Sequence, residues 1–319
     1  MKTRRERRCC NHGYFSYVSN LFSIIAGRKF RGWGRKRTGR FALWCYEHFG
    51  GELILFEDGF IRSLGLGVEG APSFSLVEDD VGIYYDAKTP SKLENILNTY
   101  DFFRDDILMK QARKAIALVK DHHISKYNNA QDINNRFRSK YGMRDGVTVK
   151  RILVIAQTAG DASLEYGMLD ACSTDELIAS ALRENPDDQV YLKVHPDVLS
   201  GKKHSDIDIE KAKEKCIIIE ESVDPMALLE YFSKVYTKTS GMGFEALLVG
   251  CECVCFGMPF YAGWGVTDDR SRCERRIVTR SVEEIFAAAY ILYTRYNNPY
   301  KERDCDIFEV IEEIVARRL

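Results

Sequence analysis

The sequence predicts an α/β protein with two domains, each built around a parallel sheet. The chain has 319 residues, 45% hydrophobic and 29% charged, which is the composition of a globular protein and the length of about two domains. Short apolar runs alternate with helical stretches along the whole chain, as they do in βαβ units. One run, residues 53–56, is apolar without interruption and indicates a strand buried on both faces.

A polar stretch at 123–148 divides the chain and predicts a helix followed by an interdomain linker. A second series of strands and helices begins at Arg151. We therefore expect four segments: a basic leader (1–28), an N-terminal Rossmann-like domain (29–148), a C-terminal Rossmann-like domain (149–278), and C-terminal helices that pack back on the N-terminal domain (279–319).

In the N-terminal half, glycines and charged turns separate the predicted elements. Ser91 is expected to cap a helix through its side-chain oxygen, and the acidic turn at 78–80 joins two strands. The predicted strands are residues 30–34, 53–56, 74–77 and 83–85, and the predicted helices are residues 40–49, 91–98 and 105–122.

The C-terminal half repeats this alternation. The predicted strands are residues 152–156, 189–194, 216–219, 234–236 and 251–256, and the predicted helices are residues 175–184, 225–232, 244–248, 281–295 and 304–318. Cys251, Cys253 and Cys255 alternate within one strand, so we expect them to share a face as small buried residues that cannot bridge one another.

The turn before the predicted helix at 244–248 could bind an anion. Thr239, Ser240 and Gly241 are small residues at a helix start, where free backbone N–H groups and the helix dipole favour a phosphate. The alternative is an ordinary connection in which Ser240 serves only as the N-cap. Gly250 is expected to end this helix.

Polar side chains follow several predicted strands at their carboxyl ends, where open α/β sheets bind ligands. These residues are Glu57, Asp58, Gln157, Asp161, Lys193, His195 (followed by Pro196), Thr239 and Ser240. If the two domains face each other, Glu57 lies opposite Asp161, with His195 and Ser240 beside a bound anion. Two carboxylates across a sugar are the groups that retaining glycosyl transfer requires, one as nucleophile and the other as acid/base.

Some candidate residues have two interpretations on sequence alone. Arg62 is either a solvated loop charge or a clamp for a substrate carboxylate, and Glu245 is either a surface charge or a ligand for a ribose hydroxyl. Asp161 could equally be the N-cap of the segment that follows it. Arg35 and Lys36 form a basic turn after a strand and are candidates for contacts with a sugar carboxylate or the acceptor.

Charge and cysteine content limit the function classes. The formal net charge of −1 gives no overall attraction to nucleic acid, and no group of residues has the spacing of a metal site. Ten cysteines without a disulfide framework indicate a reducing compartment. The first forty residues carry twelve Lys and Arg residues against one acid, which predicts either contact with an anionic membrane or a solvated terminus. Because residues 15–26 are too short and polar to span a bilayer, we expect a cytoplasmic protein, peripheral on the inner membrane.

Seven motifs in order resemble the bacterial capsule polysaccharide biosynthesis family of β-Kdo glycosyltransferases, where Kdo is 3-deoxy-D-manno-octulosonic acid. They are GWGRKRTG (32–39), EDGFIRSLGLG (57–67), LVEDDVGIYYDA (76–87), QTAGDAS (157–163), KVHPDV (193–198), SGMGFEALLVG (240–250) and GMPFYAGWG (257–265). An ordered set of this kind is far more specific than a single glycine-rich loop.

The resemblance implies a GT-B-like fold, with two Rossmann-type domains facing across a cleft. The acceptor would bind on the side of residues 29–148 and the donor, CMP-Kdo, in residues 149–278. The resemblance implies transfer with retention of the β configuration, without cofactor or metal. By motif, Asp161 matches the family's proposed nucleophile and Glu57 its acid/base, with Asp58 as the neighbouring alternative. His195 and Ser240 match groups that hold the CMP phosphate and cytidine.

The resemblance also implies partners. These are a lipid-linked or Kdo-bearing acceptor in capsular polysaccharide linker synthesis and, beside it, capsule biosynthesis or export proteins. Many family members carry two such modules, whereas this sequence holds one. Two alternatives remain open: a GT-B transferase that uses another nucleotide sugar, or a catalytically silent module that binds a nucleotide sugar or scaffolds an assembly.

Overall fold

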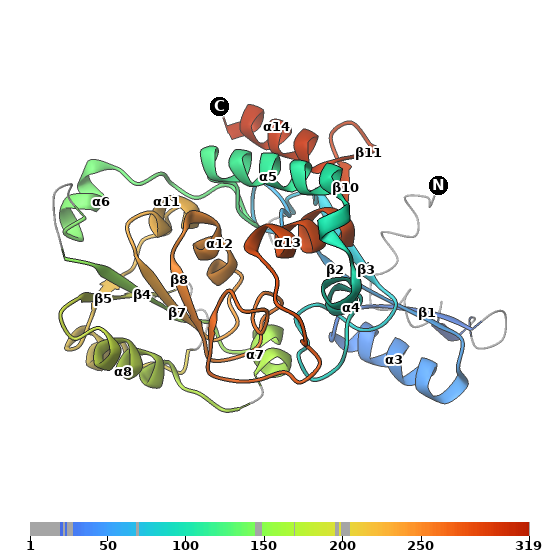
Figure 1. Cartoon of the computed structure of the whole chain (residues 1–319), viewed down its shortest axis with the longest axis horizontal. Helices are drawn as coiled ribbons and strands as arrows, with labels where there is room; N and C mark the ends of the chain where they lie inside the picture. The colour runs from blue at the N-terminus through green and yellow to red at the C-terminus, as the bar shows by residue number, and fades with distance from the viewer. Residues whose placement is uncertain are drawn as a thin grey trace.

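The computed structural model describes residues 20, 21, 23, 28–67, 70–143, 149–168, 170–194, 198 and 205–318. The predicted leader therefore lies almost wholly outside the described residues, and so do His195 and Pro196. The described chain forms two sheets with helices around them (Figure 1).

The first sheet is mixed, so the prediction of a parallel sheet in this half is wrong. Its order is β1-β2-β3-β10-β11, and only β1 and β2 run parallel. A helix separates β1 from β2, whereas a loop without a long helix returns the chain from β2 to β3, and the two strands pair antiparallel. The strands are β1 (Lys29–Trp33), β2 (Glu52–Asp58), β3 (Ser75–Asp79), β10 (Thr294–Asn298) and β11 (Arg303–Cys305).

The helices of this half largely follow the predicted pattern. Ser91 caps its helix by accepting a hydrogen bond from Glu94 N, as expected. The strand predicted at 83–85 is wrong, because these residues form a turn after Asp79, whose carboxylate accepts hydrogen bonds from the backbone N–H groups of Val81 and Gly82. The helices are α3 (Arg37–Phe49), α4 (Lys92–Thr99), η2 (Phe102–Arg104), α5 (Asp106–Asp121) and α6 (Asn135–Lys140).

The second sheet is parallel throughout, which confirms the prediction for this half. Its order is β6-β5-β4-β7-β8-β9. The chain runs from β4 outward through β5 to β6, then returns to place β7 on the other side of β4. The strands are β4 (Arg151–Ile155), β5 (Gln189–Lys193), β6 (Ile217–Ile219), β7 (Lys234–Thr237), β8 (Glu252–Cys255) and β9 (Asp268–Asp269). The order therefore reverses between β4 and β7, where doubly wound sheets bind ligands.

The helices of the second half are α7 (Ala162–Gly167), α8 (Thr174–Glu184), α10 (Ile209–Lys213), α11 (Pro225–Leu229) and α12 (Met242–Val249). Gly250 ends α12 in the left-handed conformation with φ +98°, as predicted. In the strand that follows, Cys253 and Cys255 share one core cluster, whereas Cys251 lies just before β8 and belongs to another. The expected shared face therefore holds for two of the three cysteines.

The C-terminal segment returns to the first sheet. α13 (Val282–Phe286) continues as the π-helical turn η3 (Ala287–Tyr293), and α14 (Ile307–Arg318) ends the described chain. The predicted helices at 281–295 and 304–318 are found in this shortened form, but the sequence prediction missed β10 and β11 between them. Figure 1 shows α14 beside α5, and Arg318 donates to the backbone oxygen of His122 at 2.6 Å.

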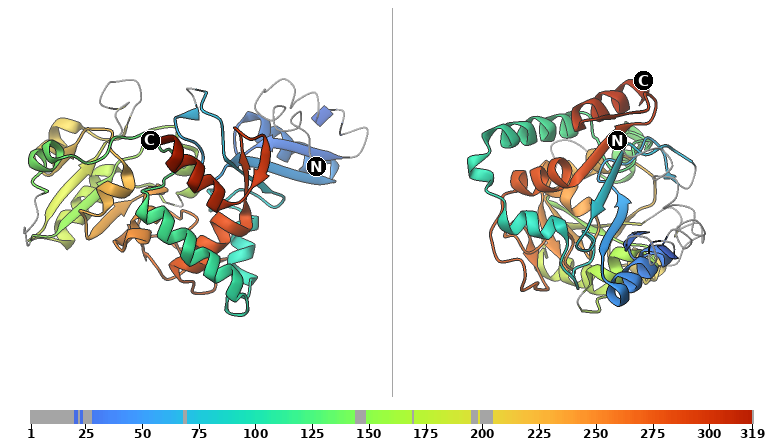
Figure 2. Two further views of the ribbon diagram at one scale, coloured as in Figure 1. Left: turned by 90° about the horizontal axis from the view of Figure 1, so that it is seen from above. Right: turned by 90° about the vertical axis from the view of Figure 1, so that its right-hand side faces the viewer.

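An aromatic core joins the two halves. Phe60, after β2, contacts Phe260 and Tyr290 at ring-centroid distances of 4.7 and 4.8 Å, and Phe244 of α12 reaches Phe260 at 5.2 Å. Seen from above, α5, α13 and α14 cross between the two sheets (Figure 2). Buried aromatic rings from both halves thus fix the relative position of the two sheets.

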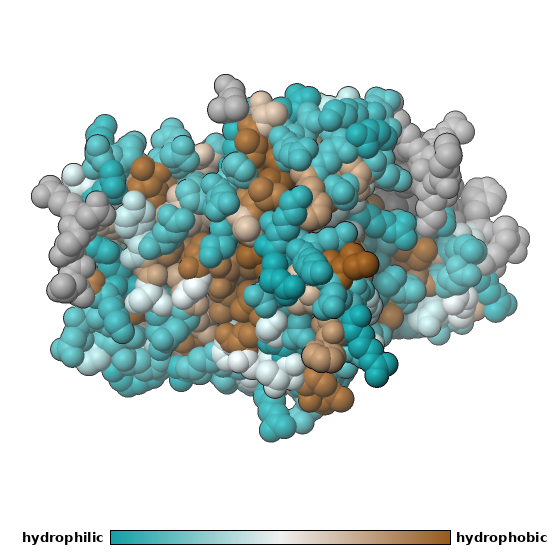
Figure 3. Space-filling model, turned by 45° about the horizontal axis from the view of Figure 1, so that its top comes forward, coloured by the Kyte–Doolittle hydropathy of each residue, from teal (hydrophilic) through white to brown (hydrophobic). Residues whose placement is uncertain are grey.

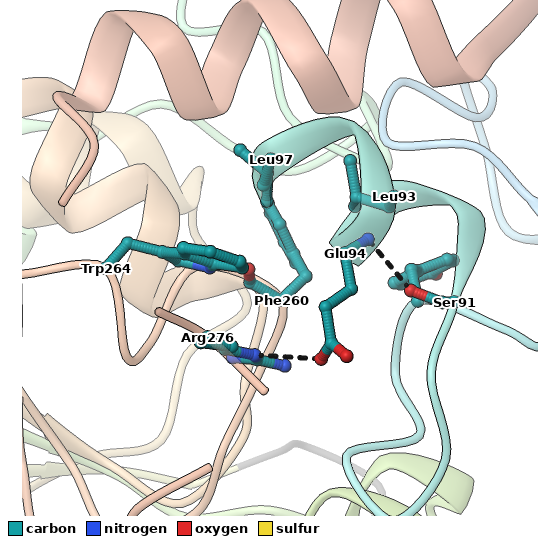
Figure 4. A pocket seen from close by; sticks show the side chains of 8 residues that line it. Ser91, Leu93, Glu94, Leu97, Phe260, Trp264 and Arg276 are labelled. Atoms are coloured by element: carbon teal, nitrogen blue, oxygen red, sulfur yellow. Dashed lines mark hydrogen bonds and ion pairs between the residues drawn. The ribbon is translucent and has the colours of Figure 1, made fainter. Parts of the chain in front are cut away.

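A buried ion pair closes one side of this core. Glu94 of α4 pairs with Arg276 at 3.3 Å, and Figure 4 shows the guanidinium group pointing at the carboxylate beside Trp264 and Phe260. Arg276 also donates to the backbone oxygen of Pro259 at 2.5 Å. These contacts attach α4 of the first half to the loop after β8 of the second.

Hydrophilic side chains cover most of the face in Figure 3, and larger apolar patches lie toward its middle. Among the described residues, no helix is both long and apolar enough to cross a membrane.

Candidate functional site

One group of side chains lies where the order of the second sheet reverses. Gln157 follows β4 and Thr239 follows β7, the two strands that flank the reversal. Thr239 N donates to Gln157 Oε1 at 2.8 Å, and Gln157 Nε2 donates to Thr239 Oγ1 at 3.1 Å. Ser163 Oγ lies 2.9 Å from Thr239 Oγ1. Hydrogen bonds between uncharged side chains therefore link the segments that follow β4 and β7.

Asp161 stands at the edge of this group. It is the N-cap of α7, and its Oδ1 accepts from Ser163 N at 2.9 Å, so the capping interpretation is confirmed as a contact. Its Oδ2 has a longer contact, 3.4 Å, with Gln157 Nε2. Asp161 itself is exposed. One oxygen thus fixes the side chain and the other has only a long contact, a geometry in which a capping carboxylate can also act as a nucleophile.

Glu57 occupies the carboxyl end of β2 in the first half. Its Oε1 accepts from Trp33 Nε1 at 2.9 Å and from Asp58 N at 3.1 Å. Burial raises the pKa of Glu57, and the positive charge of Lys126 opposes that shift most strongly. A carboxyl group whose pKa is raised keeps its proton to a higher pH than an ordinary glutamate, as acid/base residues do.

Gly34 has a steric reason to be glycine. A Cβ at this position would lie 2.3 Å from the Tyr85 hydroxyl oxygen and 2.6 Å from Glu57 Oε2, and the φ of Gly34 is +38°. The turn after β1 therefore approaches the Glu57 carboxylate closely enough to exclude a side chain.

Asp58 points to a different partner. Its Oδ2 lies 3.0 Å from Arg62 Nε in an ion pair. The Arg62 guanidinium also donates to Ser63 Oγ at 2.9 Å and to the backbone oxygen of Ala71 at 3.3 Å. Arg62 is thus a clamp, but the carboxylate that it holds belongs to this chain. This ion pair distinguishes the two neighbouring acids, because Asp58 has an ion-pair partner and Glu57, among the described residues, does not.

Hydrogen bonds attach α7, which follows Asp161, to the half of the molecule that contains Glu57 and Asp58. Ala87 N donates to the backbone oxygen of Tyr166 at 3.0 Å, and Lys88 Nζ donates to that of Glu165 at 2.6 Å. These bonds attach α7, whose N-cap is Asp161, to the first half. Acids from both halves affect the Tyr84 hydroxyl. Burial is the largest cause of its raised pKa, and the negative charges of Glu57, Asp58 and Asp161 add to it, while the positive charge of Lys126 opposes it.

The other cations predicted for the site have partners within the chain. Arg35 forms a buried ion pair with Asp86 at 2.5 Å and donates to Thr89 Oγ1 at 2.7 Å. Lys36 is exposed, with its ammonium 5.7 Å from the centre of the Trp33 ring. Lys193 Nζ donates to the backbone oxygen of Glu221 at 2.7 Å, and burial lowers the pKa of this lysine to about 8.

The start of α12 is open. Gly241 occupies the N-cap position instead of Ser240, and a Cβ built on Gly241 would meet no atom within 4 Å. The Ser240 hydroxyl accepts from Met242 N at 3.3 Å, and its backbone oxygen accepts from the Tyr261 hydroxyl at 2.5 Å. The surface at Gly241 is therefore open, two residues after Thr239.

Glu245 is placed differently from its expected role. Its side chain is buried, and its Oε1 accepts from Ser125 Oγ of the first half at 2.5 Å. Burial raises the pKa of Glu245 to about 7. Glu245 thus has an internal partner that joins α12 to the segment after α5, and this contact leaves it less suited to a ribose.

Sequence reasoning missed two residues that lie among these groups, Tyr84 and Lys126. The sequence predicts a strand at Tyr84 and a helix with a linker around Lys126. Tyr84 lies within the motif at 76–87, whereas Lys126 lies in none of the seven motifs, and only the fold places the two residues near Glu57. Among the described residues, no cluster of three or more His, Cys, Asp or Glu side chains could hold a metal ion, and metal-free transfer stays a prediction.

The fold defines a two-sheet α/β protein of the GT-B-like class. Residues 32–296 match the family described as "Capsule polysaccharide biosynthesis protein". The chain belongs to this family, and the resemblance drawn from the motifs is confirmed.

The chain is also similar to curated proteins. The chain is 41% identical over 294 residues to the capsule polysaccharide modification protein LipA of Neisseria meningitidis serogroup B, and 37% identical over 240 residues to the lipopolysaccharide-processing protein LpsZ of Rhizobium meliloti. These matches cover 89% and 75% of this chain but only 41% and 53% of the relatives. The chain therefore spans about half the length of the curated proteins it matches.

Two solved structures from Thermosulfurimonas dismutans are also similar. KpsC, described as a β Kdo 2,4 transferase, is 43% identical with a TM-score of 0.80, and the match covers 90% of this chain and 86% of that one. KpsC, described as a β Kdo 2,7 transferase, is 28% identical with a TM-score of 0.71, covering 100% and 91%.

Proposed function

We propose that the protein is a retaining glycosyltransferase that moves Kdo from CMP-Kdo to a lipid-linked or Kdo-bearing acceptor in capsular polysaccharide linker synthesis. The observation that supports the proposal is that Asp161, after β4 at the reversal of the second sheet, and Glu57, at the end of β2, are both close enough to Tyr84 to raise its pKa. The solved β-Kdo transferases of the same family support the choice of sugar.

The transfer has two balanced steps. In the first, an Asp161 carboxylate oxygen bonds to the anomeric carbon while the bond from that carbon to the CMP phosphate oxygen breaks, and CMP leaves with the electron pair. In the second, the acceptor hydroxyl oxygen attacks the same carbon, its proton passes to Glu57, and the Asp161 carboxylate is released. Two inversions at one carbon give net retention.

The second half would hold the leaving CMP. The open N-terminus of α12 at Gly241 offers a favourable helix dipole for the phosphate, whereas the Ser240 and Met242 N–H groups donate to Thr237 Oγ1 and Ser240 Oγ. Lys193 lies at the end of β5, just before His195 and Pro196, and we propose that these residues bind the nucleotide beside Gln157 and Thr239. Because CMP leaves as an anion, stabilising its charge matters more than protonating it.

The sequence identities to the two solved Kdo transferases favour the 2,4 linkage over the 2,7 linkage. The chain is 43% identical to the solved 2,4 transferase and 28% identical to the 2,7 transferase. We therefore propose that this protein forms a linkage of the 2,4 type. Since longer relatives contain additional sequence, a second linkage would require a further module or a partner protein of the capsule biosynthesis or export machinery.

Helix α3 offers a surface for a membrane-bound acceptor. Trp44, Tyr46 and Phe49 are 46%, 40% and 36% exposed, and Arg37 and Arg40 on the same helix are exposed as well. Aromatic rings beside basic side chains suit the interface of an anionic bilayer. Sedimentation with anionic vesicles tests this proposal: the double change Trp44→Ala and Phe49→Ala should lower the bound fraction, and unchanged binding would contradict it.

Two alternatives are separated by one experiment. The purified protein is incubated with CMP-Kdo generated in place and a synthetic lipid–Kdo acceptor, and the product is analysed by mass spectrometry and NMR. A single β-Kdo in 2,4 linkage is expected. Transfer only from another nucleotide sugar would identify a different GT-B transferase, and nucleotide binding without any transfer would identify a silent module.

The covalent step has its own test. Glu57→Gln should slow the second step more than the first, so an adduct of Kdo mass should accumulate and map to the peptide that contains Asp161. An adduct on another residue, or an inverted product, would exclude the proposed mechanism.

A further inference from the structure

Tyr166 is a half-buried residue of α7, the helix that has Asp161 as its N-cap. Five residues separate it from Asp161, which corresponds to about 7.5 Å along a helix axis. The Tyr166 ring also lies edge-on to the Tyr85 ring, with a distance of 6.5 Å between the ring centres. The Tyr85 hydroxyl and Glu57 Oε2 flank the position that a Cβ on Gly34 would occupy. Tyr166 is therefore connected to both candidate acids, to Asp161 through its helix and to Glu57 through the Tyr85 ring.

Lys88 lies beside this ring and is held in place by hydrogen bonds. Its side chain is exposed, and its ammonium group is 5.8 Å from the centre of the Tyr166 ring. Lys88 Nζ donates to the backbone oxygen of Glu165 at 2.6 Å, and Lys88 N donates to Asp86 Oδ1 at 2.8 Å. The preceding residue, Ala87, donates its N–H to the backbone oxygen of Tyr166 at 3.0 Å. The ammonium group is thus positioned beside the ring by the protein itself.

Arg35 contacts the same ring, but its charge is already balanced. Its guanidinium carbon is 5.7 Å from the centre of the Tyr166 ring, and the guanidinium forms a buried ion pair with Asp86 at 2.5 Å. Within the described part of the chain, the contacts of the Lys88 ammonium are with the backbone oxygen of Glu165 and the Tyr166 ring, and none is with a carboxylate. Since an ammonium group has three N–H donors, Lys88 retains donors for an anion.

An aromatic ring next to an available cation has the chemistry to bind a sugar acid. The ring offers a flat apolar surface to the C–H face of a sugar, and an ammonium group forms a strong charge-assisted hydrogen bond with a carboxylate. Burial raises the pKa of the Tyr166 hydroxyl, and the charge of Glu165 adds to this rise. The Tyr166 ring is therefore uncharged at neutral pH.

We propose that Lys88 and Tyr166 form the subsite for the acceptor sugar, in which the sugar ring packs on Tyr166 and its carboxylate binds Lys88. This inference rests on the proposed function, because it requires that a hydroxyl group of the same sugar reaches Glu57. It limits the acceptors to those whose terminal sugar is an acid. The donor sugar also carries a carboxylate, so acceptor and donor are tested separately.

Two acceptors that differ in one group test the role of Lys88. Initial rates are measured with the synthetic lipid–Kdo acceptor and with the same acceptor after its Kdo carboxyl group has been reduced to an alcohol. In the parent protein the reduced acceptor should have a KM about ten- to a hundredfold higher, the usual loss for a hydrogen bond to a charged group.

Lys88→Met should raise the KM of the acidic acceptor by a similar factor. The KM of the reduced acceptor, the KM of CMP-Kdo and kcat should stay nearly unchanged, which also shows that the variant is folded. An equal rise for both acceptors would overturn the assignment, and so would a rise in the KM of CMP-Kdo.

Further variants separate the charge from the ring. Lys88→Arg retains the charge and should restore most of the affinity for the acidic acceptor. Lys110→Met, at an exposed position on α5, is the matched control and should leave both acceptor KM values unchanged. Tyr166→Leu should raise the KM of both acceptors, because packing on the ring does not depend on the carboxylate, whereas Tyr166→Phe should have little effect. Unchanged KM values in Tyr166→Leu would overturn the role of the ring.

Binding without transfer keeps this inference separate from the proposed function. The affinities of both acceptors are measured by calorimetry in the absence of CMP-Kdo, for the parent protein and for Lys88→Met. The parent should bind the acidic acceptor more tightly than the reduced one, and Lys88→Met should abolish this preference. A preference that persists in Lys88→Met would overturn the subsite. If the preference is lost as expected but the parent transfers no Kdo, the proposed function fails while the subsite stands.

Discussion

The two halves of the site are held by different kinds of interaction. In the second half, hydrogen bonds among the uncharged side chains of Gln157, Thr239 and Ser163 position Asp161. In the first half, charges act on the two acids, since Arg62 pairs with Asp58 and the positive charge of Lys126 opposes the rise in the pKa of Glu57. The contrast predicts that geometry controls the half with Asp161, whereas pH and local charge control the half with Glu57.

The difference follows from the chemistry that each half would perform. A nucleophile must stay ionised at any working pH, so an exposed carboxylate fixed by neutral donors suits it. An acid/base group must change protonation, so a buried carboxyl balanced between desolvation and a cation suits it. The variants below are designed to remove one kind of support at a time.

The largest expected effect comes from Asp161→Asn. The amide keeps the size of the side chain but cannot form the covalent bond, so turnover should fall by roughly three orders of magnitude or more, as for other lost nucleophiles. Binding of CMP should survive, because the amide can still accept the side-chain hydrogen bonds from Ser163 N and Gln157 Nε2. Asp187→Asn, at an exposed position before β5, is the control. Turnover that persists in Asp161→Asn would assign the nucleophile elsewhere.

Glu57→Gln should have the next largest effect. Loss of a general base slows transfer by about 10²- to 10⁴-fold, and the acidic limb of the pH–rate profile should disappear with it. Asp58→Asn provides the comparison, because it removes the partner of Arg62 and should lower stability while the acidic limb remains. The reverse pattern, a limb that disappears only in Asp58→Asn, would make Asp58 the acid/base.

The sequence predicted the second half better than the first for a physical reason. Parallel strands buried on both faces appear as apolar runs, and the residues after them necessarily share one edge, which brought Gln157, Asp161 and Thr239 together correctly. The first sheet instead depends on pairing between β3 and β10, which are far apart in the chain. The segment 294–298, TRYNN, has no apolar run, so only tertiary pairing makes it a strand.

The candidate site shows the same limit. Motif position identified Glu57 and Asp58 together, but only the structure separates them, because Arg62 pairs with Asp58. Lys126 lies in a polar stretch without periodicity, and its proximity to Glu57 arises from backbone bonds to the loop after β2. A single sequence carries no signal for a through-space charge of this kind.

The hydrogen bond between Ser125 and Glu245, which joins the two halves, predicts a pH-dependent stability. Burial raises the pKa of Glu245 to about 7, so the folded protein binds a proton that the unfolded chain, with the ordinary value of 4.5, releases earlier. Stability should therefore fall as pH rises from 4.5 through about 7. The total loss should be up to about 3 kcal/mol, because each unit of difference between the folded and unfolded pKa corresponds to about 1.36 kcal/mol. Urea unfolding across this range measures the decline.

Glu245→Gln should flatten that decline while preserving a partner for Ser125. Glu283→Gln, at an exposed position on α13, should leave the pH dependence as it is. An equally steep decline in Glu245→Gln would mean that another buried acid, such as Asp224 beside it, dominates the effect.

The smallest expected effect tests the neutral half most directly. Thr239→Val keeps the shape of the side chain and the backbone bond to Gln157 Oε1, but removes the oxygen that Gln157 Nε2 and Ser163 Oγ contact at 3.1 and 2.9 Å. The loss of about one hydrogen bond, roughly 1 kcal/mol, should lower turnover about five- to tenfold. Thr99→Val, on the exposed face of α4, is the control. Because Thr239→Val removes no charge, the acidic limb should stay where it is in the parent protein. A limb that moved would show that the two halves share one electrostatic network, and the division into a geometric half and an electrostatic half would then be wrong.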